Sequence, residues 1–253
     1  MRGKIIYAGD TSLSTSASYM AGILDHAQLA FDYVASSDLI GPRLCASIPS
    51  LVILSDYPAS NFREDDFKRL LENVQCGTGC LMLGGWESFR GLSGDYQNTP
   101  LSDVLPVTML EEDDRINASQ PWVIEPVGPH PITDQLPFCE NPTYVGGFNH
   151  ITPRDGTETV LQLRSMAISM TTENVYRLQP GESKPLLVTG SFGEGRVAAL
   201  ATDVAPHWVG GFVDWGSRRL EIGAKGAREL EVGEDYVEFF TRLVRWASRH
   251  SQL

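Results

Sequence analysis

Short, unbroken runs of apolar residues recur through the first third of the chain and alternate with segments of helical spacing. The runs occupy residues 5–8, 51–54 and 80–83. Strands that are buried on both faces have this composition, because side chains in neither direction meet water. Alternation of such strands with helices is typical of a parallel sheet joined by right-handed crossovers. We therefore expect an α/β fold with a mostly parallel sheet flanked by helices.

Segments between and after these runs have the apolar spacing of amphipathic helices. One helix is predicted over residues 18–29, and another over residues 63–74 with Asn61 as its N-cap. A short strand is predicted over residues 31–35 between them. Near the end of the chain, residues 236–247 are predicted to form a helix that closes one face of the sheet.

A late hairpin and a poorly patterned middle complete the expected organisation. Residues 185–192 and 196–201 are predicted strands, and the tight turn at 193–195 makes them a β-hairpin. Between about residues 91 and 180, prolines and glycines are frequent and helical periodicity is absent. We predict loops and irregular β structure there, with short strands over residues 159–163 and 167–170, inserted in a single domain that spans residues 1–253.

Composition and charge limit the partners that we expect. The 253 residues carry a formal net charge of −12 at pH 7. A negative surface repels phosphate backbones and anionic lipid, so neither a nucleic-acid partner nor a membrane partner is expected. The chain has no apolar run long enough for a membrane-spanning helix, and we expect a cytoplasmic protein. The acidic run over residues 111–114 is interpreted as a solvated turn.

The strand predicted over residues 80–83 breaks at Gly84 and Gly85 into a turn. In open α/β sheets, ligands and reactive groups lie outside the carboxyl ends of the strands. Paired glycines allow the sharp elbow that exposes one side chain, but no Cys or Ser stands here in a G-x-C-x-G or G-x-S-x-G pattern. Ser88 lies nearby, and a Ser at such a place is more simply a helix cap.

Acidic residues follow several of the predicted strands. Asp10, Asp56 and Asp203 each come after a strand, Glu87 follows the Gly-Gly turn, and His207 lies four residues beyond Asp203. If the sheet is parallel, these side chains gather along one edge. The simpler alternative for each Asp is that it caps the turn after its strand. For His207, the alternative is a packed residue whose ring bonds to backbone.

The expected site at the carboxyl edge combines these polar residues with the elbow. We predict that the ligand-binding residues are Asp10, Asp56, Gly84, Gly85, Trp86, Glu87, Asp203 and His207. If the edge is catalytic, Asp203 and His207 are the candidates for acid–base chemistry. Several carboxylates with one His could bind a hard divalent cation. Their spacing matches no dedicated metal motif, however, so neither a metal nor another cofactor is predicted.

Motifs spread over nearly the whole chain resemble one known family. They lie at residues 77–89, 99–107, 113–115, 130–132, 193–197, 201–208, 236 and 243–246. In these motifs the chain resembles the class I glutamine amidotransferase-like proteins, an uncharacterised bacterial group. The resemblance implies a flavodoxin-like α/β fold.

The resemblance also indicates which catalytic groups are missing. True class I amidotransferases carry a Cys at the elbow, and a His and then a Glu after a late strand. Here the elbow corresponds to residues 84–88, which contain no Cys. His207 matches the His, but Val209 stands where the Glu is expected. Glutaminase activity is therefore not expected.

The four cysteines, Cys45, Cys76, Cys80 and Cys139, are interpreted as reduced cytosolic thiols. Cys80 begins its strand rather than ending it, and at about 3.3 Å per residue it lies roughly 15 Å from the elbow. A catalytic role for it is therefore not expected.

Three functions remain open from the sequence. The favoured one is a protein that binds an unknown small ligand at the carboxyl edge without the Cys-His-Glu triad. The second is a hydrolase with an Asp/His site, with or without a metal. The third is a structural subunit, and a homo-oligomer is the expected assembly.

Overall fold

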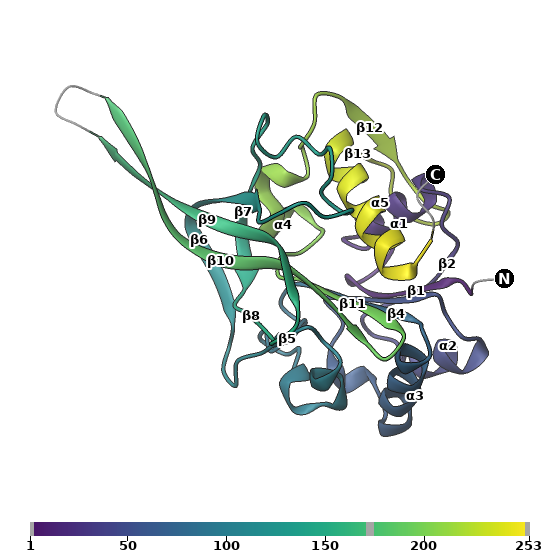
Figure 1. The fold of residues 1–253 in the computed structure, drawn as a ribbon. Coiled ribbons are helices and arrows are strands. Elements are labelled where there is room, and N and C mark those ends of the chain that lie inside the picture. Colours follow the sequence, from purple (N-terminus) through teal and green to yellow (C-terminus); the bar gives the residue numbers. More distant parts are fainter. Residues whose placement is uncertain (1–2, 171–174, 251–253) are drawn as a thin grey trace.

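The computed structural model describes residues 3–170 and 175–250, which form a nine-stranded sheet with helices on both faces (Figure 1). Five neighbouring strands run parallel, in the order β2 (Phe31–Val34), β1 (Ile5–Gly9), β3 (Leu51–Ser55), β4 (Gly79–Leu83) and β11 (Gly195–Leu200). This is the 2-1-3-4-5 order of flavodoxin-like folds. The predicted fold class is therefore confirmed.

Two layers of helices cover the parallel half of the sheet. On one face, α5 (Glu234–Ser248) packs against β3, β4 and β11 and also contacts α1 (Ser18–His26). Below the sheet in Figure 1 lie α2 (Gly41–Ala46) and α3 (Glu64–Gln75), which contact each other. The prediction that the last helix closes one face is confirmed.

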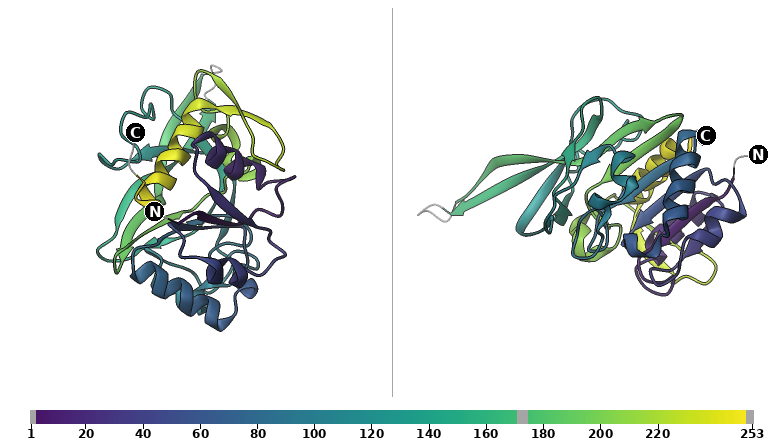
Figure 2. Two further views of the ribbon diagram at one scale, coloured as in Figure 1. Left: turned by 90° about the vertical axis from the view of Figure 1, so that its right-hand side faces the viewer. Right: turned by 90° about the horizontal axis from the view of Figure 1, so that it is seen from below.

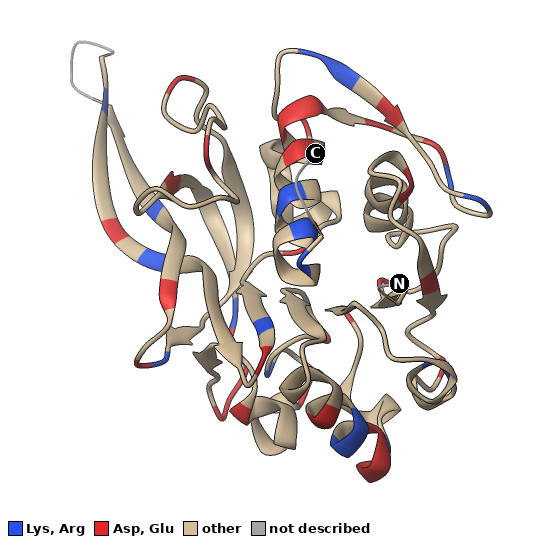
Figure 3. Ribbon diagram, turned by 45° about the vertical axis from the view of Figure 1, so that its right-hand side comes forward, with Lys and Arg blue, Asp and Glu red and all other residues tan. Residues whose placement is uncertain are grey.

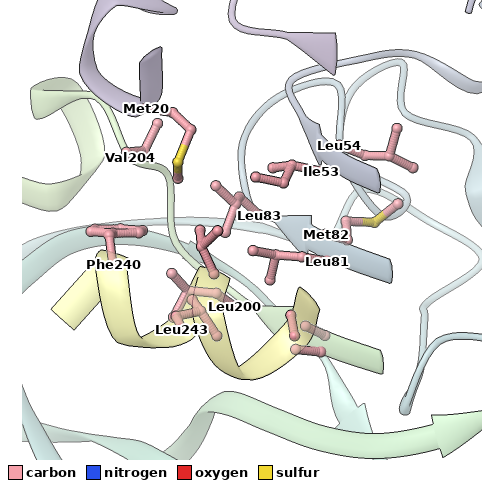
Figure 4. Packing of buried hydrophobic residues seen from close by; sticks show 14 of the residues in the cluster. Met20, Ile53, Leu54, Leu81, Met82, Leu83, Leu200, Val204, Phe240 and Leu243 are labelled. Atoms are coloured by element: carbon pink, nitrogen blue, oxygen red, sulfur yellow. The ribbon is translucent and has the colours of Figure 1, made fainter. Parts of the chain in front are cut away.

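The core lies between these layers and the parallel strands. Every residue of β1, β3 and β4 is buried, as the unbroken apolar runs predict. Alternation along the strands sends Ile53 and Leu81 toward Leu243 of α5, whereas Leu54 and Met82 point to the other face (Figure 4). All five side chains are at most 1% exposed.

The other half of the sheet is antiparallel. Its strands follow β11 in the order β10 (Tyr176–Phe192), β9 (Glu158–Met170), β6 (Arg115–Pro126) and β7 (Tyr144–Asn149). The late hairpin predicted over residues 185–201 is present as the inner part of β10 with β11. The middle of the chain is attached to the sheet as expected, but it is more regular than predicted.

The middle of the chain is more regular than its sequence predicts because bulges accommodate the residues that interrupt the strand pattern. β10 contains Pro180, Gly181 and Pro185, and its pairing with β9 shifts register near each. Proline removes a ladder hydrogen bond and is tolerated in a strand at edges and bulges. These residues interrupt the strand pattern in the sequence, while the bulges let the ladder continue past them.

Small elements complete the structure. They include α4 (Pro206–Val209), the hairpin β12 (Arg219–Ile222) with β13 (Leu230–Gly233), and the bridge of β5 (Val107–Thr108) with β8 (Thr152–Pro153). Among the described residues, no helix has both the length and the apolarity needed to span a bilayer. The cap of α3 differs from prediction: the helix begins at Glu64, and the backbone N–H of Arg63 donates to Asp66, so Asn61 is not the N-cap.

Candidate functional site

The ends of four parallel strands are aligned in register. Gly9 pairs with Ser55, Ser55 with Leu83, and Leu83 with Leu200. The residues that follow each strand therefore emerge side by side at the carboxyl edge, and these residues include Asp10 and Asp56. The register thus explains why polar residues far apart in the sequence gather at one place.

Asp10 is the most enclosed acid of this edge. It is 2% exposed, and its Oδ2 accepts a 2.5 Å hydrogen bond from the Tyr7 hydroxyl. Its Oδ1 has no partner of good hydrogen-bond geometry, although the Ser55 hydroxyl lies close enough to oppose the rise of its pKa. Burial, followed by the nearby charge of Asp56, raises the pKa of Asp10 to about 8. At neutral pH this carboxyl group is therefore largely protonated.

Asp203 lies beside His207. Its Oδ1 accepts the backbone N–H groups of Val204 at 2.5 Å and Ala205 at 2.9 Å. Its Oδ2 lies 3.2 Å from Nδ1 of His207, an ion-pair distance, but without hydrogen-bond geometry. The Asp203 side chain is 1% exposed, whereas that of His207 is 50% exposed. Burial, and then the charges of Asp10 and Asp56, raise the pKa of Asp203.

Asp56 joins this cluster to the elbow. Its backbone takes a left-handed conformation with φ of 43°, which Asp tolerates better than most residues. Its Oδ1 accepts the backbone N–H of Glu87 at 2.8 Å. Burial raises the pKa of Asp56, an effect opposed by the hydrogen bond from Glu87 and by the charge of His207. The pKa of Glu87 is also raised, by burial and by Asp56.

The two glycines of the elbow are required by close packing. A Cβ on Gly85 would lie 2.0 Å from Oδ1 of Asp56, and its φ is +153°. A Cβ on Gly84 would lie 2.4 Å from the carbonyl oxygen of Ala201. The hydroxyl of Ser88 is buried and accepts the backbone N–H of Asp56 at 3.0 Å. Ser88 therefore fastens the turn rather than facing a substrate.

Two buried polar residues that the sequence patterns do not reveal hold the elbow from behind. Asn149 accepts the N–H of Gly85 at 2.9 Å and donates to the Gly85 carbonyl and to Asp114. Asp114 in turn accepts the backbone N–H groups of Arg90 and Gly91. Residues 111–113 are exposed as predicted, but Asp114 is 2% exposed, so the solvated-turn interpretation is wrong for it.

Trp86 forms the outer rim of the elbow. It is 43% exposed, and the guanidinium carbon of Arg115 lies 4.5 Å from its ring centre. A cation over an indole face is attracted by the ring quadrupole, which steadies an otherwise exposed side chain. Trp208 and Trp215 are buried and donate to Asn117 and to the Asn141 carbonyl, so they belong to the packed interior.

The structure therefore brings the eight predicted residues to one edge. It does not bring a thiol there: Cys80 is buried at the start of β4, and burial raises its pKa to about 12. Cys76 lines a separate cavity with Thr78 and Glu194, near the amino end of β4. Among the described residues, no three His, Cys, Asp or Glu side chains are arranged to hold a metal ion.

Comparisons of structure agree with this fold. A cytoplasmic protein of Salmonella typhimurium, STM3548, superposes with a TM-score of 0.72 at 22% identity, over 96% of this chain and 98% of that one. A second, STM1381 of strain LT2, gives 0.70 at 21%, over 96% and 99%. A "thua-like" protein of Parabacteroides merdae gives 0.61 at 12%, over 100% and 93%. At these identities the likeness establishes the fold alone.

Comparisons of sequence place the chain in a family. A search among curated proteins finds no match. A family model, whose description reads "Putative glutamine amidotransferase", matches residues 27–221, which is well over half of the 253 residues. The matched segment includes β3, β4, the elbow, β11 and the Asp203–His207 pair. The chain belongs to this glutamine amidotransferase-like family.

Proposed function

We propose that the chain binds a small molecule rich in hydrogen-bond donors at the carboxyl edge of its parallel strands and does not hydrolyse glutamine. One observation carries the proposal. Oδ1 of Asp10 and Oδ2 of Asp203 are buried without hydrogen-bond partners, within a cluster beside the half-exposed His207. Buried polar atoms are nearly always satisfied, so the two atoms call for a donor, which is a retained carboxyl proton in the free protein and a ligand group in the complex.

The charge of the cluster favours a ligand that carries an ammonium group. Ionised carboxylates only accept hydrogen bonds and repel one another, so burial and repulsion make the free cluster retain protons at neutral pH. The charge of Asp56 raises the pKa of Asp10, and the charges of Asp10 and Asp56 raise the pKa of Asp203, in each case in addition to burial. A bound cation would relieve this repulsion and would displace protons from the cluster. Binding is therefore expected to be tighter at pH 8 than at pH 6.

The enclosure of the cluster limits how a ligand enters. Asp10 and Asp203 have almost no exposed surface, whereas His207 does. Movement of the His207 side chain is therefore the simplest way to open the cluster, to which Glu87 is joined by its backbone hydrogen bond to Asp56. A cytoplasmic location belongs to the same proposal, and the two Salmonella proteins named as cytoplasmic support it.

A thermal-shift panel tests the ligand. The probes are methylamine, putrescine, glutamine and glycerol, each at pH 6 and pH 8. We expect an amine to raise the unfolding midpoint of the wild type, and to do so more at pH 8. Asp203→Asn should lose the shift, whereas Asp155→Asn, at an exposed acid in the turn before β9, should keep it. No shift with any probe, or an equal shift in Asp203→Asn, contradicts the proposal.

A glutaminase assay tests the negative half of the proposal. We expect wild-type protein to release no glutamate from glutamine above the buffer rate, because no thiol lies at the elbow. Release that is lost in Cys80→Ala would show that this thiol reacts in spite of its burial. That result would overturn the proposal.

One contact favours a second candidate function, a hydrolase. In many hydrolytic sites a buried carboxylate supports a partly exposed imidazole that acts as the base. Oδ2 of Asp203 lies 3.2 Å from Nδ1 of His207, so a small rotation of the ring would bring the two into this relation. If His207 acts as a general base toward water, p-nitrophenyl acetate should be hydrolysed and His207→Ala should slow the reaction by about 10²-fold. An equal rate in wild type and His207→Ala removes this candidate.

A further inference from the structure

The outer part of the β9–β10 hairpin projects from the body of the molecule (Figures 1 and 2). The pairing of β6 with β9 ends at Ser165, and β11 pairs with β10 only over residues 187–192. Beyond those points the two strands pair with each other alone. We call the described residues of this ribbon, 166–170 and 175–180, the arm.

The two faces of the arm differ sharply in polarity. Opposed residues in a strand pair share a face, and successive residues alternate between faces. One face consists of three opposed pairs: Met170 with Tyr176, Ile168 with Leu178, and Met166 with Pro180. We call these six residues the arm face. The opposite face consists of Ser169 with Arg177 and Ala167 with Gln179.

The arm face is open to solvent over most of its length. Ile168 is 53% exposed, Leu178 and Met170 are each 62% exposed, and Tyr176 is 70% exposed. Isolated two-stranded ribbons have little stability of their own in water. A contiguous exposed apolar surface usually marks an interaction site. A ribbon of this shape therefore needs a partner to cover it.

The polarity of β9 reverses where the strand leaves the body. Within the body, Leu161 and Leu163 are buried, while Gln162 and Arg164 on the other face contact Glu125. Beyond Ser165, the side that carried Gln162 and Arg164 carries the apolar arm face. The arm face is therefore no extension of the chain's own core.

We infer that the arm face packs against the arm face of a second copy of this chain. The three opposed pairs of the arm face are all apolar, so the same surface of two copies can pack together. A two-fold axis would relate the two arms, as in an isologous dimer. Anionic lipid is disfavoured as the occupant, because the chain carries a net charge of −12.

Charge also favours contact between arms over contact between bodies. Among the described arm residues, Arg177 is the one charged side chain, and Figure 3 shows the outer hairpin almost free of coloured charges. Two acidic bodies repel each other, but this repulsion is screened beyond about 8–10 Å in physiological salt. Because the arms project, the bodies stay apart when the arms meet.

Light scattering coupled to size-exclusion chromatography tests this interface with a matched pair of variants. We expect the wild type to have twice its chain mass of 27.8 kDa. Ile168→Asp with Leu178→Asp places two charges on the arm face and should give a monomer. Ser169→Asp with Gln179→Asp places the same charges one position away, on the opposite face, and should remain a dimer. The circular dichroism spectrum and unfolding midpoint of the diluted proteins show whether each double variant folds.

Three outcomes would overturn the inference. A wild type that is monomeric at the highest soluble concentration excludes the dimer. A dimer that survives in the folded arm-face variant uses another surface. Flotation of monomeric wild type with phosphatidylcholine vesicles, lost in the arm-face variant, would assign the arm face to lipid. The amine-binding assay at the carboxyl edge is independent of all three results.

Discussion

The parallel and antiparallel halves of the sheet differ in how completely their strands are buried. In the parallel half, β1, β3 and β4 are buried throughout, and their aligned ends place polar residues at one edge. In the antiparallel half, β9 and β10 contain buried residues in the part near the body and only exposed residues at their far ends. Complete burial fixes the register of a strand tightly, and that precision positions a site. Partial burial leaves a surface free for contact with another molecule.

The largest expected difference between the halves is in stability. Leu81 is fully buried in β4, so Leu81→Ala should lower the free energy of unfolding by about 2–5 kcal/mol through lost burial and a residual cavity. Urea denaturation followed by circular dichroism measures the change. A loss below about 1 kcal/mol would mean that the parallel half is less tightly packed than its burial indicates.

Stability should also depend on pH through the carboxyl edge. The pKa of Asp10 is about 8 in the folded protein and about 3.8 as the reference for the unfolded chain. Between these values the folded state keeps a proton that the unfolded state has lost. The contribution of Asp10 to the free energy of unfolding is therefore fully present below about pH 4 and falls by a few kcal/mol as pH rises to 8. Asp10→Asn should flatten this dependence in denaturation at pH 5, 6, 7 and 8, and an unchanged slope would contradict the assignment.

A smaller loss is expected behind the elbow. Asn149→Ala removes the side chain that bonds both backbone groups of Gly85 and also Asp114. Leaving these buried groups without partners should cost about 1–3 kcal/mol. His150→Ala is the matched control at the next residue, and its half-buried side chain should matter by less than about 0.5 kcal/mol. Equal effects of the two substitutions would show that the network does not hold the elbow.

The smallest effect is expected in the arm. Ile168 is an exposed residue of a strand, so Ile168→Ala should change the stability of the monomer by less than about 0.5 kcal/mol. The measurement uses the conditions of Leu81→Ala, at a concentration low enough to keep the protein monomeric. A large loss would mean that the arm is packed against its own body in solution, and the comparison between the halves would fail.

Burial determines which parts of the fold can be predicted from the sequence. The runs at residues 5–8, 51–54 and 80–83 are apolar on both faces, and a short run of this kind is typical of a strand covered by helices on both sides. β9 and β10 are harder to predict, because their alternation changes face at Ser165 and prolines interrupt β10. The sequence predicts two short strands, at residues 159–163 and 167–170, where the structure has the single strand β9 (Glu158–Met170). The neighbouring strands of the sheet hold this strand together through its change of face.

The candidate site is predictable in part for the same reason. Asp10, Asp56 and Asp203 follow strands, so parallel topology alone places them at one edge. Asn149 and Asp114 act through contacts with residues far away in the sequence, and a buried Asn or Asp carries no sign of its partner. The position of Asp114 at the end of an acidic run even favours the opposite prediction, solvent exposure.

The contact between Gly85 and Asp56 has an evolutionary consequence. A thiol introduced at position 85 would bring a Cβ to 2.0 Å from the Asp56 carboxylate, on a backbone that L residues rarely adopt. A single substitution there would not place a nucleophile at the elbow, because the Asp56 carboxylate must also move or be replaced. The intermediate with only one change would carry either a steric clash or a disrupted turn. Because two changes are needed at once, substitutions at Gly85 alone should be selected against, and the glycine should persist.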